Sequence, residues 1–161
     1  MREIKFRGLS DNEDGTQEMV YGDLIHDKKG QTAYFDTHPC RITWKLDKGG
    51  ASKPIRKGTE GQYTGLKDKN GTEIFEGDIC LVQIVTTNHP NHMSGEMTGV
   101  VKWYRNGWAI IPTKYAGKIT KYFGENTIYG FLPHNISDKQ NIEVIGNKFE
   151  SPELLEKTET K

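Results

Sequence analysis

The sequence predicts a mainly β protein made of short antiparallel strands, and three observations support this class. Glycines and turn-forming pairs recur about every ten residues, a spacing typical of short strands rather than helices. Apolar and polar residues alternate between these turns, as in Arg41–Leu46, where Ile42, Trp44 and Leu46 share one face. Only one segment, beginning at Ser151, carries the signals that start a helix.

The first part of the chain predicts a group of strands that ends in a linker. Glu3–Arg7 alternates apolar and charged residues, and further candidate strands follow at Met19–Ile25 and Thr32–Phe35. Residues 48–61 are rich in Gly, Ser, Lys and Pro, a composition that predicts a loop or linker. We therefore expect residues 1–57 to form an N-terminal β elaboration.

Residues 58–150 are expected to form the core, a β-barrel. The run Ile79–Val85 is apolar at nearly every position, which predicts a central strand covered on both faces. The preceding Glu76-Gly77-Asp78 predicts a tight turn, and Asn70-Gly71 and Asn106-Gly107 predict hairpins, because Asn and Gly tolerate positive φ. The other strands expected in this core are Gln62–Leu66, Thr72–Phe75, Gly99–Tyr104, Trp108–Ile111, Ile128–Leu132 and Ile142–Ile145.

Residues 151–161 are expected to form a short helix and a disordered tail. Ser151 suits the N-cap, Pro152 the first helical position, and Glu153 complements the helix dipole. Leu154 and Leu155 could dock this helix on the core, whereas the following residues offer nothing to bury.

Composition excludes several classes of protein. The chain has 161 residues with 22 basic and 22 acidic side chains, and a generic nucleic-acid binder usually shows a basic excess instead. The two cysteines do not make a disulfide framework, and Met1–Arg7 contains no apolar stretch of the kind that signal peptides carry. The longest apolar-leaning run, Ile79–Val85, is far shorter than a membrane span. We expect the cytoplasm of a bacterial host as the compartment.

Three segments together resemble the YopX family, small proteins of phages and prophages. They are Met1–Arg7, the central and most specific Gln62–Ile79, and Val144–Asn147 continuing through Ser151–Leu155. The resemblance implies a mostly β protein with an SH3-like core. It carries over no catalytic or binding residue.

Catalytic motifs are lacking in the sequence, and we expect neither an enzyme nor a cofactor. There is no Gly-x-Ser-x-Gly elbow, phosphate loop or dinucleotide fingerprint. Cys80 lies in the most apolar strand, where a thiol acts as a small hydrophobe. Glu76 and Asp78 could form a carboxylate pair, but a structural role in the turn is favoured.

The best metal-like feature is His89-Pro90-Asn91-His92. Two imidazoles three residues apart could hold Zn²⁺ if a further ligand, such as His38 or Cys40, joined them. No recognised ligand spacing is present, and Pro-Asn segments are ordinary surface turns. We therefore expect no metal site and keep a metal-dependent enzyme at His89 and His92 as an alternative.

A hairpin that interleaves cations and aromatics is the best candidate for binding. No acidic residue occurs between Met97 and Gly124, and such a block could form a basic patch. The simpler interpretation, which we favour, places Trp103 in the core, packs Trp108 across the hairpin beside Tyr104, and leaves the cations solvated. If the segment binds a partner, the candidate residues are Lys102, Tyr104, Arg105, Trp108, Lys114, Lys118 and Lys121.

These observations lead to a preferred function and two alternatives. We expect a non-enzymatic phage accessory protein that binds a phage or host protein through a face or the loops of its β-barrel. The first alternative is a nucleic-acid-binding β-barrel that uses residues 97–124, and the second is the metal-dependent enzyme. Homo-oligomerisation stays open, and the sequence does not name a partner.

Overall fold

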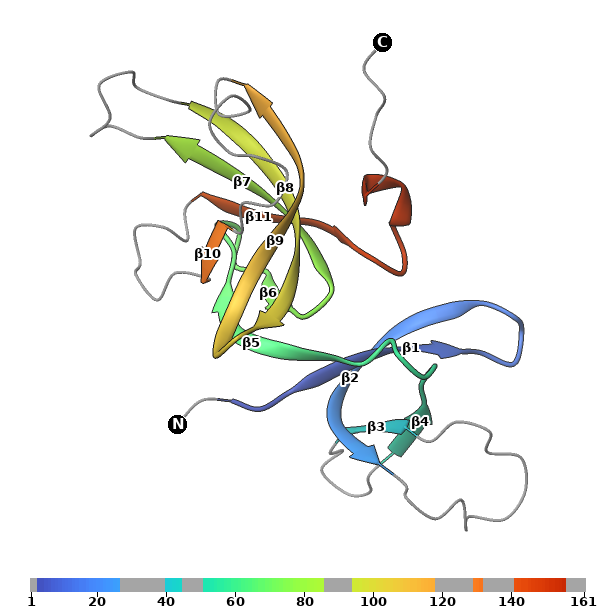
Figure 1. The fold of residues 1–161 in the computed structure, drawn as a ribbon. Coiled ribbons are helices and arrows are strands. Elements are labelled where there is room, and N and C mark those ends of the chain that lie inside the picture. Colours follow the sequence, from blue (N-terminus) through green and yellow to red (C-terminus); the bar gives the residue numbers. More distant parts are fainter. Residues whose placement is uncertain are drawn as a thin grey trace. The chain divides into compact units, whose positions relative to one another are not determined.

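The computed structural model describes residues 3–26, 40–44, 51–85, 94–117, 129–131 and 141–155 (Figure 1). Their regular structure is strand, apart from one 3₁₀ turn, η2 (Pro152–Leu155), which confirms the mainly β class. No helix within these ranges has the length and apolar character that crossing a membrane requires. The strands are β1 (Phe6–Asp11), β2 (Gln17–His26), β3 (Cys40–Trp44), β4 (Ala51–Pro54), β5 (Gly61–Lys67), β6 (Glu73–Phe75), β7 (Asp78–Val85), β8 (Ser94–Tyr104), β9 (Gly107–Gly117), β10 (Tyr129–Phe131) and β11 (Ile142–Asn147).

The chain forms two compact units, Met1–Gly65 and Leu66–Lys161, and the strands pair in two sheets. The strand orders are β4-β3-β2-β1-β5-β6 and β10-β9-β8-β7-β11, with antiparallel pairing. Within the described residues the strand pairing does not close into the expected SH3-like barrel, so the mainly β class is the part of the fold prediction that is confirmed. The division of the sequence at residues 57 and 150 stays a prediction.

The first unit is built on the β1–β2 hairpin. Its turn, Asn12 to Gly15, has the hydrogen bonds of a type I turn followed by a glycine bulge, with Gly15 at a φ of 84°. Ile55 is fully buried against this hairpin: a Cβ on Gly8 would lie 2.6 Å from its Cδ1 atom. The next residue, Arg56, donates its backbone N–H to the carbonyl of Leu9 at 2.8 Å, so the chain leaving β4 returns to β1.

The second unit is built on the antiparallel meander β7–β8–β9, with β11 on the other edge of β7 (Figure 1). In β7 the side chains of Cys80, Val82 and Ile84 point into the core, because residues two apart share a face. The core cluster consists of Ile74, Cys80, Val82, Ile84, Met97, Val101, Trp108, Ile110 and Ile142.

Strand β7 is covered on both faces only at its beginning. On the face opposite to the core cluster, Ile79 is buried, but Leu81 is half-buried and Gln83 is exposed. The prediction of a strand covered on both faces throughout is therefore wrong. Glu143 of β11, which pairs with Leu81, also lies only half-buried.

The turn between β5 and β6 is fixed to β11. Gly71 donates its N–H to the carbonyl of Asp68, and Asp68 donates its own to Thr72, which again makes a type I turn with a glycine bulge. The N–H of Lys69 bonds the carbonyl of Ile142 at 3.0 Å. A turn that the sequence predicts locally is thus tied to a strand far along the chain.

The predicted C-terminal helix is only the 3₁₀ turn η2. The N–H of Leu154 bonds the carbonyl of Ser151, three residues back, which is the spacing of a 3₁₀ turn. The side-chain oxygen of Asn147 accepts the backbone N–H groups of Phe149 and Glu150, and its carbonyl accepts the N–H of Ser151, so a separate turn leads directly into η2. The tail after residue 155 lies outside the described residues.

Candidate protein-binding hairpin

The hairpin formed by β8 and β9 carries the candidate site, and its register is set by a two-residue loop. Tyr104 pairs with Gly107, so Arg105 and Asn106 form the loop. Arg105 has a φ of 54° and is the one non-glycine residue with a positive φ in the described part of the chain. The Asn106-Gly107 pair predicted positive φ at these two residues. In the structure the positive φ occurs at Arg105 instead, although Gly or Asn adopts this conformation more easily than Arg.

Trp103 and Trp108 form a cross-strand pair at the end of this hairpin. Their ring centroids lie 5.0 Å apart with an interplanar angle of 86°, an edge-to-face contact. Trp108 is 7% exposed and belongs to the core cluster, but Trp103 is 53% exposed. The prediction that Trp103 lies in the core is therefore wrong, because half of its side chain is exposed. The side chain does lie on the core-facing side of β8, which it shares with buried Val101.

The cations of the hairpin lie apart from Trp103. Lys102 and Tyr104 fall on the opposite face of β8, and Lys102 is exposed. The guanidinium of Arg105 lies 5.3 Å from the ring centroid of Tyr104, in a cation–π contact. Lys114 is exposed but pairs with Thr98, about 13 Å along the strand from Lys102 at ~3.3 Å per residue.

The structure therefore gathers four of the seven predicted residues at one end of the hairpin. These are Lys102, Tyr104, Arg105 and Trp108. Lys118 and Lys121 lie outside the described residues. Trp103 was not among the predicted binding residues, yet it is the most exposed aromatic side chain of the hairpin. The sequence held a signal for its position: with a two-residue loop at Arg105-Asn106, residues 103 and 108 are cross-strand partners.

The buried indole of Trp108 carries a hydrogen-bond donor, its Nε1–H group. Its Nε1–H is inaccessible to solvent and has no hydrogen-bond partner among the described residues. Buried donors in folded proteins nearly always find a partner, so an unsatisfied one is a feature that needs a physical explanation.

The metal-like features of the sequence fall elsewhere. His38, His89 and His92 lie outside the described residues, and only the backbone of Cys40 is described. Within the described ranges, no three His, Cys, Asp or Glu side chains gather as metal ligands would. Cys80 forms no disulfide and is fully buried in the core cluster.

The turn Glu76-Gly77-Asp78 has the structural role that the sequence favoured. Gly77 has a φ of 83°, and Oδ2 of Asp78 accepts the N–H of Phe75 at 2.7 Å. Gly77 also donates its N–H to the carbonyl of Val101 at 2.8 Å. The bond from Asp78 closes the turn, and the bond from Gly77 connects it to strand β8.

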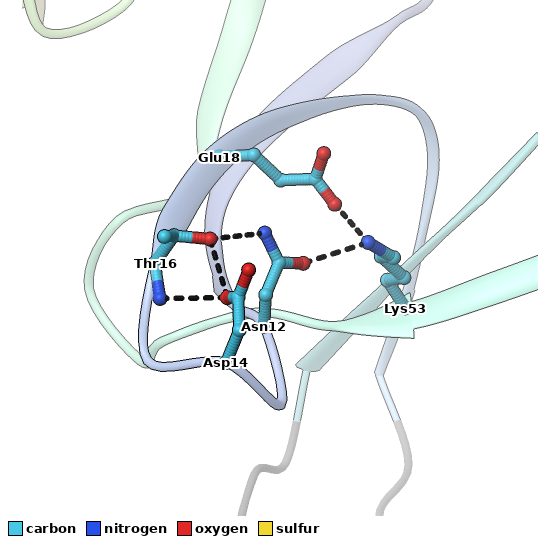
Figure 2. A network of polar contacts seen from close by, with 5 residues as sticks. All are labelled: Asn12, Asp14, Thr16, Glu18 and Lys53. Atoms are coloured by element: carbon cyan, nitrogen blue, oxygen red, sulfur yellow. Dashed lines mark hydrogen bonds and ion pairs between the residues drawn. The ribbon is translucent and has the colours of Figure 1, made fainter.

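A polar network in the first unit resembles an ion site in composition but contains its own cation (Figure 2). Asp14 accepts the hydroxyl of Thr16 at 2.6 Å and its backbone N–H at 2.9 Å, and these two bonds lower the pKa of Asp14. The ammonium of Lys53 donates to Asn12 at 3.0 Å and pairs with Glu18. Lys53 therefore supplies the positive charge, and the network ties the β1–β2 hairpin to β4.

Fold and side chains together define a small, mainly β protein with a tryptophan pair at the end of a hairpin, in which Trp103 is half-exposed and Trp108 is buried. The chain belongs to the YopX family: the family model described as YopX protein matches residues 4–156. The chain is also similar to a solved structure, the crystal structure of protein EF1440 from Enterococcus faecalis, with 21% identity and a TM-score of 0.43. That similarity covers 97% of this chain and 100% of the other. No curated protein matches the sequence.

Proposed function

We propose that this YopX-family protein is a non-enzymatic accessory protein that binds another protein through the end of the β8–β9 hairpin. The observation that carries the proposal is the 53% exposure of Trp103 beside the buried Trp108. Tryptophan is enriched at the centres of protein interfaces, because it combines a large apolar surface with a polar group. The paired strands position its backbone and the Trp108 ring contacts its side chain, which lowers the entropy that binding would cost.

Nucleic-acid binding is the second candidate and has less support. Binding to single strands needs stacking rings and phosphate-binding cations along one groove. Trp103 and Lys102 lie on opposite faces of β8, and the net charge of the chain is zero. The third candidate, a metal-dependent enzyme, depends on His89 and His92, which lie outside the described residues.

The expected setting is the cytoplasm of a bacterium that carries a phage or prophage, and the expected partner is a phage or host protein. Photo-crosslinking in such cells tests the proposal. A photoreactive amino acid replaces exposed Lys102 at the hairpin, and a matched control replaces exposed Lys57 in the first unit. We expect a discrete protein adduct from position 102 that is lost with Trp103→Ala and absent from position 57.

Two results would contradict the proposal. Equal adducts from positions 102 and 57 would mean that the hairpin is not the binding surface. An adduct from position 102 that nuclease digestion removes would identify a nucleic acid as the partner and support the second candidate instead.

A further inference from the structure

We infer that Asn106, in the loop of the β8–β9 hairpin, is a site of spontaneous deamidation in the folded protein, whereas Asn70 is protected from the same reaction. Both residues precede a glycine. The inference does not depend on the proposed function, because the reaction needs only the chain itself and water. It rests on two differences between the sites: the hydrogen bonds that hold each turn, and the charges that lie beside it.

Asparagine before glycine is prone to deamidation, because glycine has no Cβ to shield its backbone nitrogen. The nitrogen of Gly107 loses its proton to hydroxide and attacks Cγ of Asn106, so a carbon–nitrogen bond forms. The bond from Cγ to Nδ2 breaks, and the leaving nitrogen takes a proton from water and departs as ammonia. Water then opens the resulting five-membered imide at one of its two carbonyls, which yields aspartate or isoaspartate.

The turn that contains Asn70 is held on several sides. Oδ1 of Asp68 accepts the N–H of Asn70 at 2.8 Å, and the carbonyl of Asp68 accepts the N–H of Gly71, the attacking group, at 3.1 Å. The same turn is bonded to β11 through the N–H of Lys69 and through Oδ2 of Asp68, at 3.0 Å in each case. Bringing the nitrogen of Gly71 onto Cγ of Asn70 therefore breaks its bond to Asp68 and disturbs the contacts of the turn with β11.

The loop that contains Asn106 has fewer restraints. It consists of Arg105 and Asn106 at the end of the hairpin, and both residues are exposed. The side chain of Asn106 makes no hydrogen bond within the described part of the chain. The attacking nitrogen belongs to Gly107, which pairs with Tyr104 as the last pair of the hairpin. A terminal pair opens at low cost in free energy, so this site reacts without wider unfolding.

The charges beside Asn106 favour the reaction. The attacking nitrogen passes through a negatively charged form, which a nearby cation stabilises and a nearby anion destabilises. Arg105 precedes Asn106 in the chain, and no acidic residue occurs between Met97 and Gly124.

The charges beside Asn70 oppose the reaction. The carboxylate of Asp68 bonds its backbone N–H, and Oε1 of Glu143 lies 3.5 Å from its Nδ2. The nearest cation in the chain, Lys69, pairs with Glu143 at 2.6 Å, so the two charges offset each other. Charge and hydrogen bonding thus separate the two sites in the same direction.

Deamidation of Asn106 changes both the charge and the geometry of the hairpin end. A carboxylate replaces a neutral amide beside Arg105, in a segment that otherwise carries no acidic residue. In isoaspartate the backbone runs through the side-chain carbon, which adds a methylene group to a two-residue loop. We therefore expect isoaspartate to disturb the pairing of Tyr104 with Gly107.

Incubation of the full chain in mildly alkaline buffer tests the inference. Peptide mass spectrometry follows both sites in one sample, since replacing NH₂ by OH raises the mass, and an isoaspartyl methyltransferase quantifies isoaspartate. We expect conversion of Asn106, and a rate at Asn70 at least about tenfold lower, because the bonds of its turn to a carboxylate must open first. In denaturant, where both turns are lost, the two rates should agree within about twofold.

Variants separate the two causes. Asp68→Asn weakens the turn and removes a carboxylate, so we expect the rate at Asn70 to rise about threefold or more while the rate at Asn106 stays unchanged. Arg105→Gln removes the cation beside Asn106 and should slow its conversion about two- to threefold. The matched control is Arg56→Gln, which removes an exposed cation in the first unit and should change neither rate.

Three results would overturn the inference. Asn106 that stays intact in the folded protein but is converted in denaturant would mean that the hairpin protects it. Equal rates at Asn70 and Asn106 in the folded protein would mean that the bonds to β11 give no protection. Both results come from the wild-type chain and need no variant to fold. An unchanged rate at Asn70 in Asp68→Asn would exclude Asp68 as the protecting group.

Discussion

The carboxylate of Asp68 accepts the backbone N–H of Val144 at 3.0 Å, across 76 positions of sequence. Its other oxygen accepts the N–H groups of Asn70 and Thr72 at 2.8 and 2.9 Å, inside its own turn. An ion pair between Lys69 and Glu143, with 2.6 Å between nitrogen and oxygen, lies beside this contact. One buried side chain therefore shapes the β5–β6 turn and holds β11 to it.

The first prediction is that Asp68→Asn lowers the free energy of unfolding by about 1.5–3 kcal/mol, the range for hydrogen bonds to a charged group. An asparagine keeps one acceptor oxygen, but its amide nitrogen would face a backbone N–H. Chemical denaturation measures the effect. Asp14→Asn is the matched control, because Asp14 also bonds the N–H two residues ahead but sits in an exposed turn. We expect the control to cost much less, and equal costs would refute a special role for the contact with β11.

The second prediction concerns acid. Burial raises the pKa of Asp68, but the hydrogen bonds from Val144, Thr72 and Asn70 together outweigh it and lower the pKa below 3.8. The folded carboxyl then holds its proton less tightly than the unfolded one, so unfolding takes up a proton. This contribution to stability is complete above pH 3.8 and is lost as the pH falls through the folded pKa.

Denaturation curves between neutral pH and pH 2 check this dependence. Wild-type stability should fall more steeply below pH 4 than that of Asp68→Asn, which lacks the titrating group. If the wild-type and Asp68→Asn stabilities fell in parallel with pH, the pKa of Asp68 would be the same in the folded and unfolded states. That result would contradict the lowering of its pKa by the hydrogen bonds.

The third prediction is that Gly8→Ala destabilises the first unit by about 1–3 kcal/mol, the usual cost of overpacking. The added Cβ would lie 2.6 Å from Cδ1 and 2.9 Å from Cγ2 of Ile55, which has no free space because it is fully buried. A double-mutant cycle checks the cause. Gly8→Ala should cost less when Ile55 is already alanine, and the same cost in both backgrounds would exclude the collision.

The fourth prediction separates the two tryptophans by stability. Trp108→Ala removes a core side chain and should cost about 3–5 kcal/mol. Trp103→Ala loses mainly the edge-to-face contact, so about 1 kcal/mol or less is expected. Thermal or denaturant unfolding of both variants measures the difference. A larger cost for Trp103→Ala would mean that the roles of the two side chains are reversed.

The features that the sequence predicted well are those that local chemistry decides. Gly71 and Gly77 have positive φ in the two turns where glycine was expected to serve, and Asp78 caps the second of these turns. The loop at Asn106-Gly107 was also expected, but the residue with positive φ is Arg105. A shift of the hairpin register by one residue is enough to move the positive φ to the neighbouring residue. The register in turn depends on how the two strands pair along their whole length.

The sequence by itself determined the β class, the turns at Gly71 and Gly77 and the YopX family, because alternation and backbone preferences act between neighbours in the chain. Only the tertiary structure decided depth and long-range pairing. Trp103 and Trp108 share a face, yet only Trp108 reaches the core, since depth depends on which other elements cover that face. The contact of Asp68 with Val144 likewise exists only after β11 has paired with β7, because no local pattern specifies a partner so far along the chain.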